Sequence, residues 1–454
     1  MIEMAEVTDT FDCFGSGCAI LLSSDGDEGS ARAAVAEARR RLESWHERFS
    51  RFLPDSELAL LNGDGEEARV VGGAVRNALL QIPIGDIDIA TTALPTEVIR
   101  RAKSAGIKSV PTGIAHGTVT LVVEGHPFEV TTLREDAETF GRKARVAFGH
   151  DWIVDAQRRD FTINGLSVDA DGSVHDHVGG LADIAARRVR FIGDPDQRIA
   201  EDYLRILRFF RIHAAFGEGE PDRAGTLACV RARAGLVTLS AERVRMEMLK
   251  LLVAKGAIEA IAAMSEGGLL LPIFGGVAYC GPFATMIAAE RSLGLRPDPV
   301  RRLGALAVAV TEDARRLATR LRLSNAETRM LDSMGHRWWR LAGMDEATAR
   351  RRLYRLGADR YRDRLLLAWA RAGSDASSAR WRELATLPER WSAPKFPLKA
   401  ADFIARGIAE GPAIGHVLAL AEDAWLAANF ALDQPTLDTI ADQTVSRFTG
   451  DHRL

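Results

Sequence analysis

Two aspartates, Asp86 and Asp88, stand two positions apart in the apolar stretch GDIDIATT. If this stretch is a β-strand, both carboxylates project from one face while Ile87 and Ile89 face the core. Two carboxylates this close repel each other unless a cation lies between them. Mg²⁺ suits this role because it takes oxygen ligands and is held by one or two carboxylates together with substrate phosphates. The alternative is a strand end with two solvated acids, so the neighbouring residues must decide.

A glycine turn precedes the aspartates in the stretch VVGGAVRNALL, which predicts a strand that ends at Gly72 and Gly73 and enters a helix. Glycines at such a turn let the backbone approach a phosphate, and the first helical N–H groups point at it. Taken alone, the turn is more often a matter of packing. A third carboxylate, Glu129 in FEVTTLRED, lies on another predicted strand. Three acids on adjacent strands beside a glycine turn predict a two-metal phosphoryl-transfer site.

The elements that must position these residues change character along the chain. Residues 30–50 predict one amphipathic helix with a serine cap, followed by the polar joint NGDGEE. Residues 69–193 show short β-branched runs broken by Gly and Pro, the last of them VRFIG, and predict a mixed sheet with helices. After GDPDQR the pattern is almost wholly helical. The expected fold class is therefore α+β.

The composition of the 454 residues is that of a globular protein of two to four domains, with 47% hydrophobic and 27% charged residues. No run approaches the roughly 18 apolar residues of a membrane span. The N-terminus lacks the basic flank and apolar core of a signal peptide, so we expect a cytoplasmic protein without a membrane partner. No C-x-x-C pair suggests a zinc site or a disulfide framework among Cys13, Cys18, Cys229 and Cys280.

The formal net charge of -3 does not indicate a nucleic-acid-binding protein, but the charge is unevenly distributed. Residues 301–390 contain 20 Arg, no Lys and 11 acidic residues, an excess of nine positive charges. Such a block is either a solvated helical surface with internal ion pairs or a surface that contacts phosphates. The sequence leaves both interpretations open.

A series of motifs in a fixed order resembles the class II tRNA nucleotidyltransferases and bacterial poly(A) polymerases. The resemblance runs from about residue 68 to 255 and more loosely through the helical remainder. It implies a nucleotidyltransferase-type head, a helical neck, and a helical body and tail that bind RNA; we place them at residues 63–193, 194–260 and 261–454. The motifs are GGAVRN, GDIDIAT, EVTTLR, RRDFTINGL, GGLADI with VRFIGDP, RIAEDYLRILRFFR and SAERVRMEMLKLL.

The resemblance assigns roles to the residues singled out above. It implies that Asp86 and Asp88 bind Mg²⁺ and that Glu129 is a third catalytic carboxylate. One metal would lower the pKa of the attacking 3′-hydroxyl while the other neutralises charge on the triphosphate. The other residues expected at the nucleotide are Gly72, Gly73 and Arg76, the ribose and phosphate motif residues Arg158, Arg159, Asp160 and Asn164, and Arg208.

The motif EDYLR contains Asp202 and Arg205, three apart on a predicted helix and therefore on one face. The resemblance implies that this pair reads the incoming base. Cytosine and adenine each offer an amino donor beside a ring-nitrogen acceptor, which match a carboxylate and a guanidinium. Guanine and uracil present a carbonyl to the carboxylate, and a mismatched buried pair discriminates strongly. The alternative is a surface ion pair.

Three positions depart from the family pattern. The family often has Asp where this chain has Asn77. Phe140 stands where a polar or acidic residue is usual, in a loop associated with the switch from adding C to adding A. Gly165 replaces a more common Ala. Terminal A addition is therefore the activity that the sequence supports least.

Two further segments have more than one interpretation. In SVHDHVGG, His175 and His177 flank Asp176, which allows a metal site but is more typical of alternating strand residues. Residues 11–62 resemble the opening segment of FAD:protein FMN transferases, without the flavin-binding and metal-binding remainder of that family. We interpret residues 1–62 as a fused fragment without catalysis of its own.

The leading functional hypothesis is template-independent addition of CMP and AMP, from CTP and ATP, to tRNA 3′ ends. A poly(A) polymerase shares the catalytic motifs, but the C-terminus TVSRFTGDHRL is not an extended basic tail. A flavin-binding protein and a catalytically inactive RNA-binding protein are alternatives from other classes, and the intact acids disfavour the latter. No obligate protein partner is expected.

Overall fold

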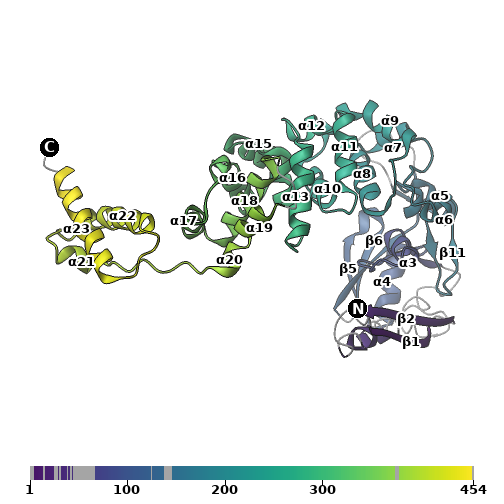
Figure 1. Ribbon diagram of the computed structural model, residues 1–454. Coiled ribbons are helices and arrows are strands. Elements are labelled where there is room, and N and C mark those ends of the chain that lie inside the picture. The colour runs from purple at the N-terminus through teal and green to yellow at the C-terminus, as the bar shows by residue number, and fades with distance from the viewer. Residues whose placement is uncertain are drawn as a thin grey trace. The chain divides into compact units, whose positions relative to one another are not determined.

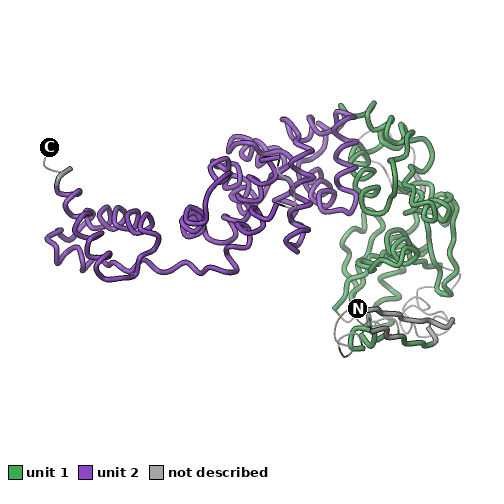
Figure 2. Tube along the Cα trace, in the orientation of Figure 1, with its two compact units in different colours: residues 1–235 green, residues 236–454 purple. Residues whose placement is uncertain are grey.

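The protein divides into two compact units, residues 1–235 and residues 236–454 (Figure 2). Every strand among the described residues belongs to the first unit, and the described part of the second unit is helical. The four-part domain division expected from the sequence stays a prediction. The computed structural model describes residues 5–13, 16–24, part of 29–43, 67–123, 125–136, 146–373 and 378–451.

A seven-stranded mixed sheet forms the centre of the first unit, with the strand order β11-β10-β3-β4-β7-β6-β5 (Figure 1). The pair β4 and β7 is parallel, and the other neighbours are antiparallel. The mixed sheet predicted from the sequence is confirmed. Its strands are β3 (Ala68–Val71), β4 (Asp88–Thr91), β5 (Lys108–Gly113), β6 (Thr118–Val123), β7 (His126–Thr132), β10 (Ser167–Val168) and β11 (Val174–His175).

The two faces of this sheet bury different side chains because residues alternate along each strand. Helix α4 (Pro95–Ser104) covers one face, where Ile89 and Val130 are almost fully buried. The side chains of Asp88 and Glu129, one position earlier in β4 and β7, therefore project from the opposite face. That face carries a smaller cluster, consisting of Val71, Ala90 and Leu133 with Trp152 packed against it.

The first unit also contains a second two-stranded ribbon and several short helices. The ribbon is β8 (Arg134–Asp136) with β9 (Val146–Phe148). The helices are α3 (Gly73–Leu79), α5 (Trp152–Arg158), α6 (Gly180–Ala185), α7 (Pro195–Glu201), α8 (Leu204–Phe216) and α9 (Arg223–Arg231), with a 3-10 turn, η2 (Thr162–Asn164).

The predicted strand at VRFIG is wrong. This segment makes only an isolated bridge between Phe161 and Phe191. The Phe191 ring lies 5.0 Å from the Phe161 ring and 5.3 Å from the Phe209 ring, measured between centroids. The β-branched and aromatic composition that suggested a strand serves this aromatic packing instead.

The N-terminal segment contains a hairpin of β1 (Ala5–Cys13) and β2 (Ser16–Ser24), with Ala5 opposite Ser24. Arg39 binds Asp9 at 3.1 Å and lies over the Phe11 ring, 5.0 Å from its centroid. The described residues among 29–43 are helical, as predicted. The rest of the predicted helix and most of the NGDGEE joint lie outside the described residues, as does Phe140.

The second unit confirms the helical remainder predicted after GDPDQR. No described helix is long and apolar enough to cross a membrane. Its helices are α10 (Ala241–Leu252), α11 (Ala257–Glu266), α12 (Leu270–Phe274), α13 (Cys280–Ser292), α14 (Pro299–Ala307), α15 (Thr311–Leu321), α16 (Asn325–Gly335), α17 (Glu346–Leu356), α18 (Ala358–Arg371), α19 (Ala379–Ala385), α20 (Leu387–Arg390), α21 (Ala400–Ile404), α22 (Pro412–Ala427) and α23 (Gln434–Asp451).

Several arginines of the block at 301–390 form ion pairs inside this unit. Glu290, 1% exposed, accepts from Arg302 at 2.7 Å and from Arg301 at 3.1 Å. Arg301 also donates to Asp363 at 2.8 Å. This part of the positive excess therefore neutralises buried carboxylates, as a buried charge requires.

Candidate active site

The parallel pairing of β4 with β7 brings two of the predicted carboxylates together. Asp88 lies directly opposite Glu129 in the register, and both project from the face that α4 does not cover. Burial, the charge of Glu129 and a smaller contribution from Asp86 raise the pKa of Asp88, while Arg159 acts in the opposite direction. These carboxylates thus form a cluster of negative charge, which favours a cation.

Asp86 precedes β4 and is exposed, with Ile87 packed against the sheet core beside it. Exposure alternates along Asp86, Ile87, Asp88 and Ile89 as expected, but the strand begins only at Asp88, so the shared strand face of the two aspartates stays a prediction. Within the described ranges, no three His, Cys, Asp or Glu side chains could hold a metal by themselves. Two carboxylates with open positions fit Mg²⁺, which completes its shell with water and substrate phosphates.

The glycine turn after β3 leaves room for Arg159, whose guanidinium donates to Asp155 at 2.9 Å. Gly72 has a φ of 72°, a conformation that L side chains rarely adopt, and a Cβ at this position would lie 3.2 Å from Nη1 of Arg159. Its amide donates to the carbonyl of Leu166 at 3.1 Å, which joins the turn to the segment after η2. Gly73 begins α3. The turn therefore lets an arginine approach the backbone next to the carboxylates.

Four predicted nucleotide-contacting residues from three segments form one hydrogen-bonded network. Arg76 on α3 donates to Oδ1 of Asn164, and Nδ2 of Asn164 donates to Oδ1 of Asp160 at 3.1 Å. Arg208 on α8 donates through Nε to Oδ2 of Asp160 at 2.7 Å. Asn77 accepts from Arg76 at 2.8 Å, so the amide at this position holds the guanidinium in place.

The charges in this network are strongly coupled. Burial lowers the pKa of Arg76 to about 10, helped by the neighbouring Arg211 and opposed by Asp160. The guanidinium carbon of Arg76 also lies 3.7 Å from the centroid of the Phe216 ring. Burial alone would raise the pKa of Asp160, but Arg208 and Asn164 outweigh it and the pKa lies below its usual range. Asp160 is therefore the counter-charge for two guanidinium groups, those of Arg208 and Arg76.

Asp160→Asn should lower the free energy of unfolding by about 3 kcal/mol at neutral pH, since it removes the counter-charge of the half-buried Arg208 and of the buried Arg76. The depressed pKa of Asp160 means that its stabilisation is complete above the unfolded value of about 3.9 and is lost as the pH falls below it. Urea unfolding at several pH values should show the difference from the wild type shrinking below about pH 4. A difference independent of pH, or one matched by the exposed Glu220→Gln control, would contradict this role.

The predicted base-reading pair does not lie on one helix. Helix α7 ends at Glu201, Asp202 is extended with φ -155° and ψ 106°, and α8 begins at Leu204. Oδ1 of Asp202 accepts from the amide of Leu204 at 3.1 Å, which favours a turn over a continuous helix. Arg205 donates to the carboxylate of Glu201. The expectation of a shared helical face for Asp202 and Arg205 is therefore wrong.

Arg198 is a functional candidate that the sequence reasoning missed. Only 8% of Arg198 is exposed, and its guanidinium donates to the carbonyls of Arg158 and Arg159 and, at 2.6 Å, to Glu201. It therefore joins α7 to the segment carrying the ribose and phosphate motif. Helix α7 has the polar sequence PDQRIAE, in which nothing marks Arg198 as a buried residue, so the sequence carried no signal for it.

Steric crowding explains why this chain has Gly165 where the family more often has Ala. A Cβ at Gly165 would lie 2.6 Å from Cγ2 of Val178 and 3.3 Å from Cδ1 of Ile192. Such an approach is much closer than a normal contact between carbon atoms. The alanine usual in the family therefore does not fit this chain unless Val178 moves.

Gly165→Ala should accordingly lower the free energy of unfolding by about 2 kcal/mol through overpacking. Adding Val178→Ala should make the double variant more stable than Gly165→Ala alone, since the clashing methyl group is removed. Urea unfolding of both single variants and the double variant measures the coupling. Purely additive effects would exclude Val178 as the obstacle.

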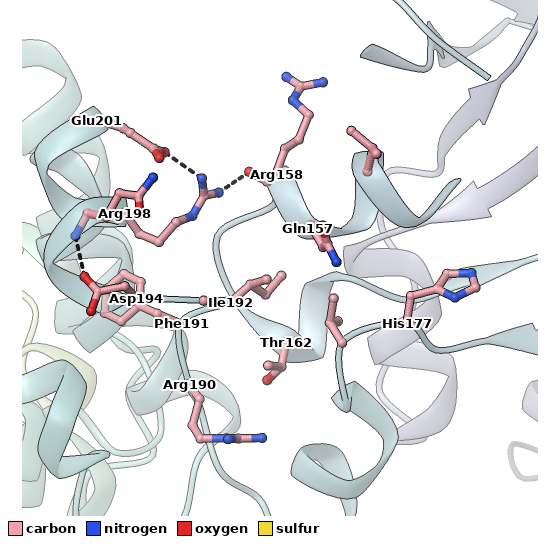
Figure 3. A pocket seen from close by; sticks show the side chains of 14 residues that line it. Gln157, Arg158, Thr162, His177, Arg190, Phe191, Ile192, Asp194, Arg198 and Glu201 are labelled. Carbon is pink, nitrogen blue, oxygen red and sulfur yellow. Dashed lines mark hydrogen bonds and ion pairs between the residues drawn. The ribbon is translucent and has the colours of Figure 1, made fainter. Parts of the chain in front are cut away.

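A cavity of about 720 Å³ lies beside this segment, on the side of Arg158 and Arg198 (Figure 3). Its walls come from α5, the segment before α6, the segment before α7, and α7 itself. The lining residues are Val154, Gln157, Arg158, Thr162, His177, Val178, Arg190, Phe191, Ile192, Gly193, Asp194, Gln197, Arg198 and Glu201.

Comparisons with known proteins identify the class of enzyme to which this fold belongs. A family model described as the poly A polymerase head domain matches residues 68–190, which include the sheet and the carboxylates. A second, described as a probable RNA and SrmB-binding site of polymerase A, matches residues 227–280. The protein is thus a nucleotidyltransferase.

Named relatives show to which family of nucleotidyltransferases the chain belongs. The mitochondrial CCA tRNA nucleotidyltransferase 1 of Mus musculus is 32% identical over 378 residues, which cover 82% of this chain and 86% of the relative. The CCA-adding enzyme of Limosilactobacillus fermentum is 33% identical over 391 residues, covering 84% and 94%. The chain belongs to the CCA-adding tRNA nucleotidyltransferase family.

Solved structures of this family share the fold. The Bacillus stearothermophilus CCA-adding enzyme in complex with CTP aligns with a TM-score of 0.65 and 25% identity, covering 87% of this chain and 97% of that one. The Thermotoga maritima CCA-adding enzyme complexed with tRNA aligns with a TM-score of 0.65 at 18% identity, covering 85% and 93%. The α+β fold class and the family resemblance predicted from the sequence are confirmed. The resemblance of residues 11–62 to flavin transferases stays a prediction.

Proposed function

We propose that this protein transfers CMP and AMP from CTP and ATP to the 3′ end of tRNA without a template. The observation that carries the proposal is the in-register pairing of Asp88 with Glu129, next to a glycine turn and Arg159. Membership of the CCA-adding family supports the tRNA substrate, since relatives carry that activity in their names. The cytoplasmic location, the domain boundaries and the absence of an obligate protein partner stay predictions.

Asp86 and Asp88 are the residues that would hold Mg²⁺, with Glu129 as the neighbouring carboxylate. When bound, the metal supplies charge neutralisation of the triphosphate and a lowered pKa of the attacking 3′-hydroxyl. Arg159 lies close enough to Asp88 to affect its pKa, so the same guanidinium is suited to a phosphate held at the carboxylates. Positioning and electrostatic stabilisation account for most of the catalysis in phosphoryl transfer.

The Arg76, Asn164, Asp160 and Arg208 network is the proposed contact for the ribose and phosphates. Asp160 is fixed by Arg208 and Asn164, so its carboxylate is held in one orientation. An oriented acceptor is suited to a ribose 2′-hydroxyl, and guanidinium groups are suited to phosphates. Gly72, Gly73 and Arg158 complete the proposed nucleotide-binding set.

Asp88→Ala should abolish nucleotide addition while leaving the fold intact, because it removes a metal ligand and relieves repulsion by Glu129 and Asp86. A lost metal interaction of several kcal/mol corresponds to a loss of rate of about 10³-fold or more. The assay supplies Mg²⁺, CTP, ATP and a tRNA lacking its CCA end, and urea unfolding reports stability. Turnover near that of the wild type would refute the assignment.

Base selection by Asp202 and Arg205 remains part of the proposal, although the two residues lie at a helix junction. Since Arg205 donates to Glu201, an incoming base would have to share or replace this ion pair. Arg205→Ala should lose both the rate and the preference for CTP and ATP over GTP and UTP, because the ring nitrogen loses its donor. Glu201→Gln keeps the donor and serves as the matched control. An unchanged preference in Arg205→Ala would exclude the role.

Poly(A) polymerase activity is the second candidate, because the matching head-domain model carries that description. The two activities differ in product length. On a tRNA that ends in CC, a CCA-adding enzyme adds one A from ATP, whereas a poly(A) polymerase extends a long tail. Separation of the products on a sequencing gel distinguishes them.

A further inference from the structure

The guanidinium of Arg76 is enclosed on several sides, and among the described residues no group in direct contact with it is a carboxylate. Nε and Nη2 donate to Oδ1 of Asn77 at 3.2 and 2.8 Å, and Nη1 donates to Oδ1 of Asn164. A Cβ at Gly73 would lie 3.4 Å from Nη2, so the guanidinium lies against the glycine turn. A further contact is with an aromatic ring, that of Phe216.

This aromatic contact is unusually close. Cζ of Arg76 lies over the ring of Phe216, the last residue of α8, at 3.7 Å from the ring centroid. The other arginines that lie over aromatic rings in the described part of the chain do so at 4.1 to 5.7 Å. The negative face of a ring attracts a guanidinium, and the attraction is stronger when the charge is desolvated. Only 7% of Arg76 is exposed, so Phe216 interacts with a largely desolvated charge.

Helix α8 acts on Arg76 in two opposite ways. Burial lowers the pKa of Arg76 most, the charges of Arg211 and Arg208 on α8 lower it further, and Asp160 raises it. Phe216 follows Arg208 by about two helical turns, so the two side chains leave α8 on similar sides. The ring therefore attracts Arg76 toward a helix whose two arginines repel it.

Phe216 differs from the other phenylalanines of α8, which belong to the hydrophobic core. Phe209 and Phe210 are fully buried, and the ring of Phe209 packs against those of Phe161 and Phe191. Phe216 is only partly buried. An aliphatic side chain could fill a comparable space, but it has no negative face to present to a guanidinium.

Arg76 keeps donors for a further ligand. Three of its five N–H groups have acceptors among the described residues, which leaves one N–H on each terminal nitrogen without an acceptor there. Charge-assisted hydrogen bonds from a guanidinium to phosphate oxygens are short and strong. A phosphate at the glycine turn can therefore accept from a guanidinium that is already held in place.

We propose that Phe216 is a positioning residue for Arg76, and that its ring holds the guanidinium against the glycine turn for the triphosphate of the incoming nucleotide. The inference rests on the proposed function, in which Arg76 contacts the phosphates. Because CTP and ATP share the triphosphate, Phe216 raises the affinity for both nucleotides and takes no part in the choice of base.

The first test measures the dissociation constants of CTP and ATP for the full-length protein with Mg²⁺ and without RNA, by isothermal titration calorimetry. Phe216→Leu removes the ring but keeps an apolar side chain, and we expect both affinities to fall by the same factor, about tenfold. Phe216→Met, a second variant without a ring, should behave in the same way. Phe216→Tyr keeps the ring and should bind both nucleotides like the wild type. Unchanged affinities in the variants without a ring, or a loss confined to one nucleotide, would overturn the proposal.

The second test asks whether the effect of Phe216 passes through Arg76. In an Arg76→Ala background, Phe216→Leu should change the affinity for CTP by less than about twofold, because the partner of the ring is absent. Inorganic pyrophosphate, which has no base, should also bind Phe216→Leu more weakly than the wild type. A full loss of CTP affinity in the Arg76→Ala background, or an unaltered affinity for pyrophosphate, contradicts the proposed role.

Phe210→Leu is the matched control, because Phe210 lies on the same helix and its ring packs against that of Phe209. This variant should lower the thermal midpoint at least as much as Phe216→Leu and bind CTP like the wild type. An equal loss of CTP affinity in Phe210→Leu would indicate a general loss of structure and exclude a specific role for Phe216. Failure of the wild type to add nucleotides to tRNA would refute the proposed function, whereas the CTP and pyrophosphate affinities test the contact with Arg76 by themselves.

Discussion

The carboxylate of Asp160 is the interaction on which the proposed nucleotide site depends. Arg208 and Arg211 from α8 and Arg76 from α3 carry like charges that act on one another. A buried charge is tolerated only when it is paired and hydrogen-bonded. Asp160 provides that pairing directly to Arg208 and, through Asn164, to Arg76. One carboxylate thereby couples the helix after the glycine turn to a helix more than one hundred residues later in the chain.

Side chains from the short segment that contains Asp160 contact several different parts of the first unit. Arg159 approaches Gly72 and the carboxylate pair, Arg158 lines the cavity on the other side, and Asn164 faces α3. Arg198 fixes the backbone of the segment by binding the carbonyls of Arg158 and Arg159. Side chains of neighbouring residues leave the backbone in different directions. A few consecutive residues can therefore face the carboxylates, line the cavity and hold α3 in place.

Local patterns in the sequence were sufficient to predict the mixed sheet and the presence of carboxylates on its adjacent strands. The alternation around Asp86 and Asp88 and the glycines at 72 and 73 are properties of a few adjacent residues, and both are present in the structure. The helix junction at Asp202 was not predicted, because the motif EDYLR has helical composition on both sides of a turn that a side-chain hydrogen bond stabilises. Arg198 was missed for a related reason: its partners lie about forty residues earlier in the chain.

The close approach of Gly165 to Val178 has a consequence for how related sequences can change. Alanine at 165 requires a smaller or displaced side chain at 178, so substitutions at the two positions are coupled. A lineage that acquires valine at 178 first must pass through a destabilised intermediate, whereas one that acquires glycine at 165 first does not. In the evolution of such sequences, the change from Ala to Gly at 165 should therefore come before the change to Val at 178.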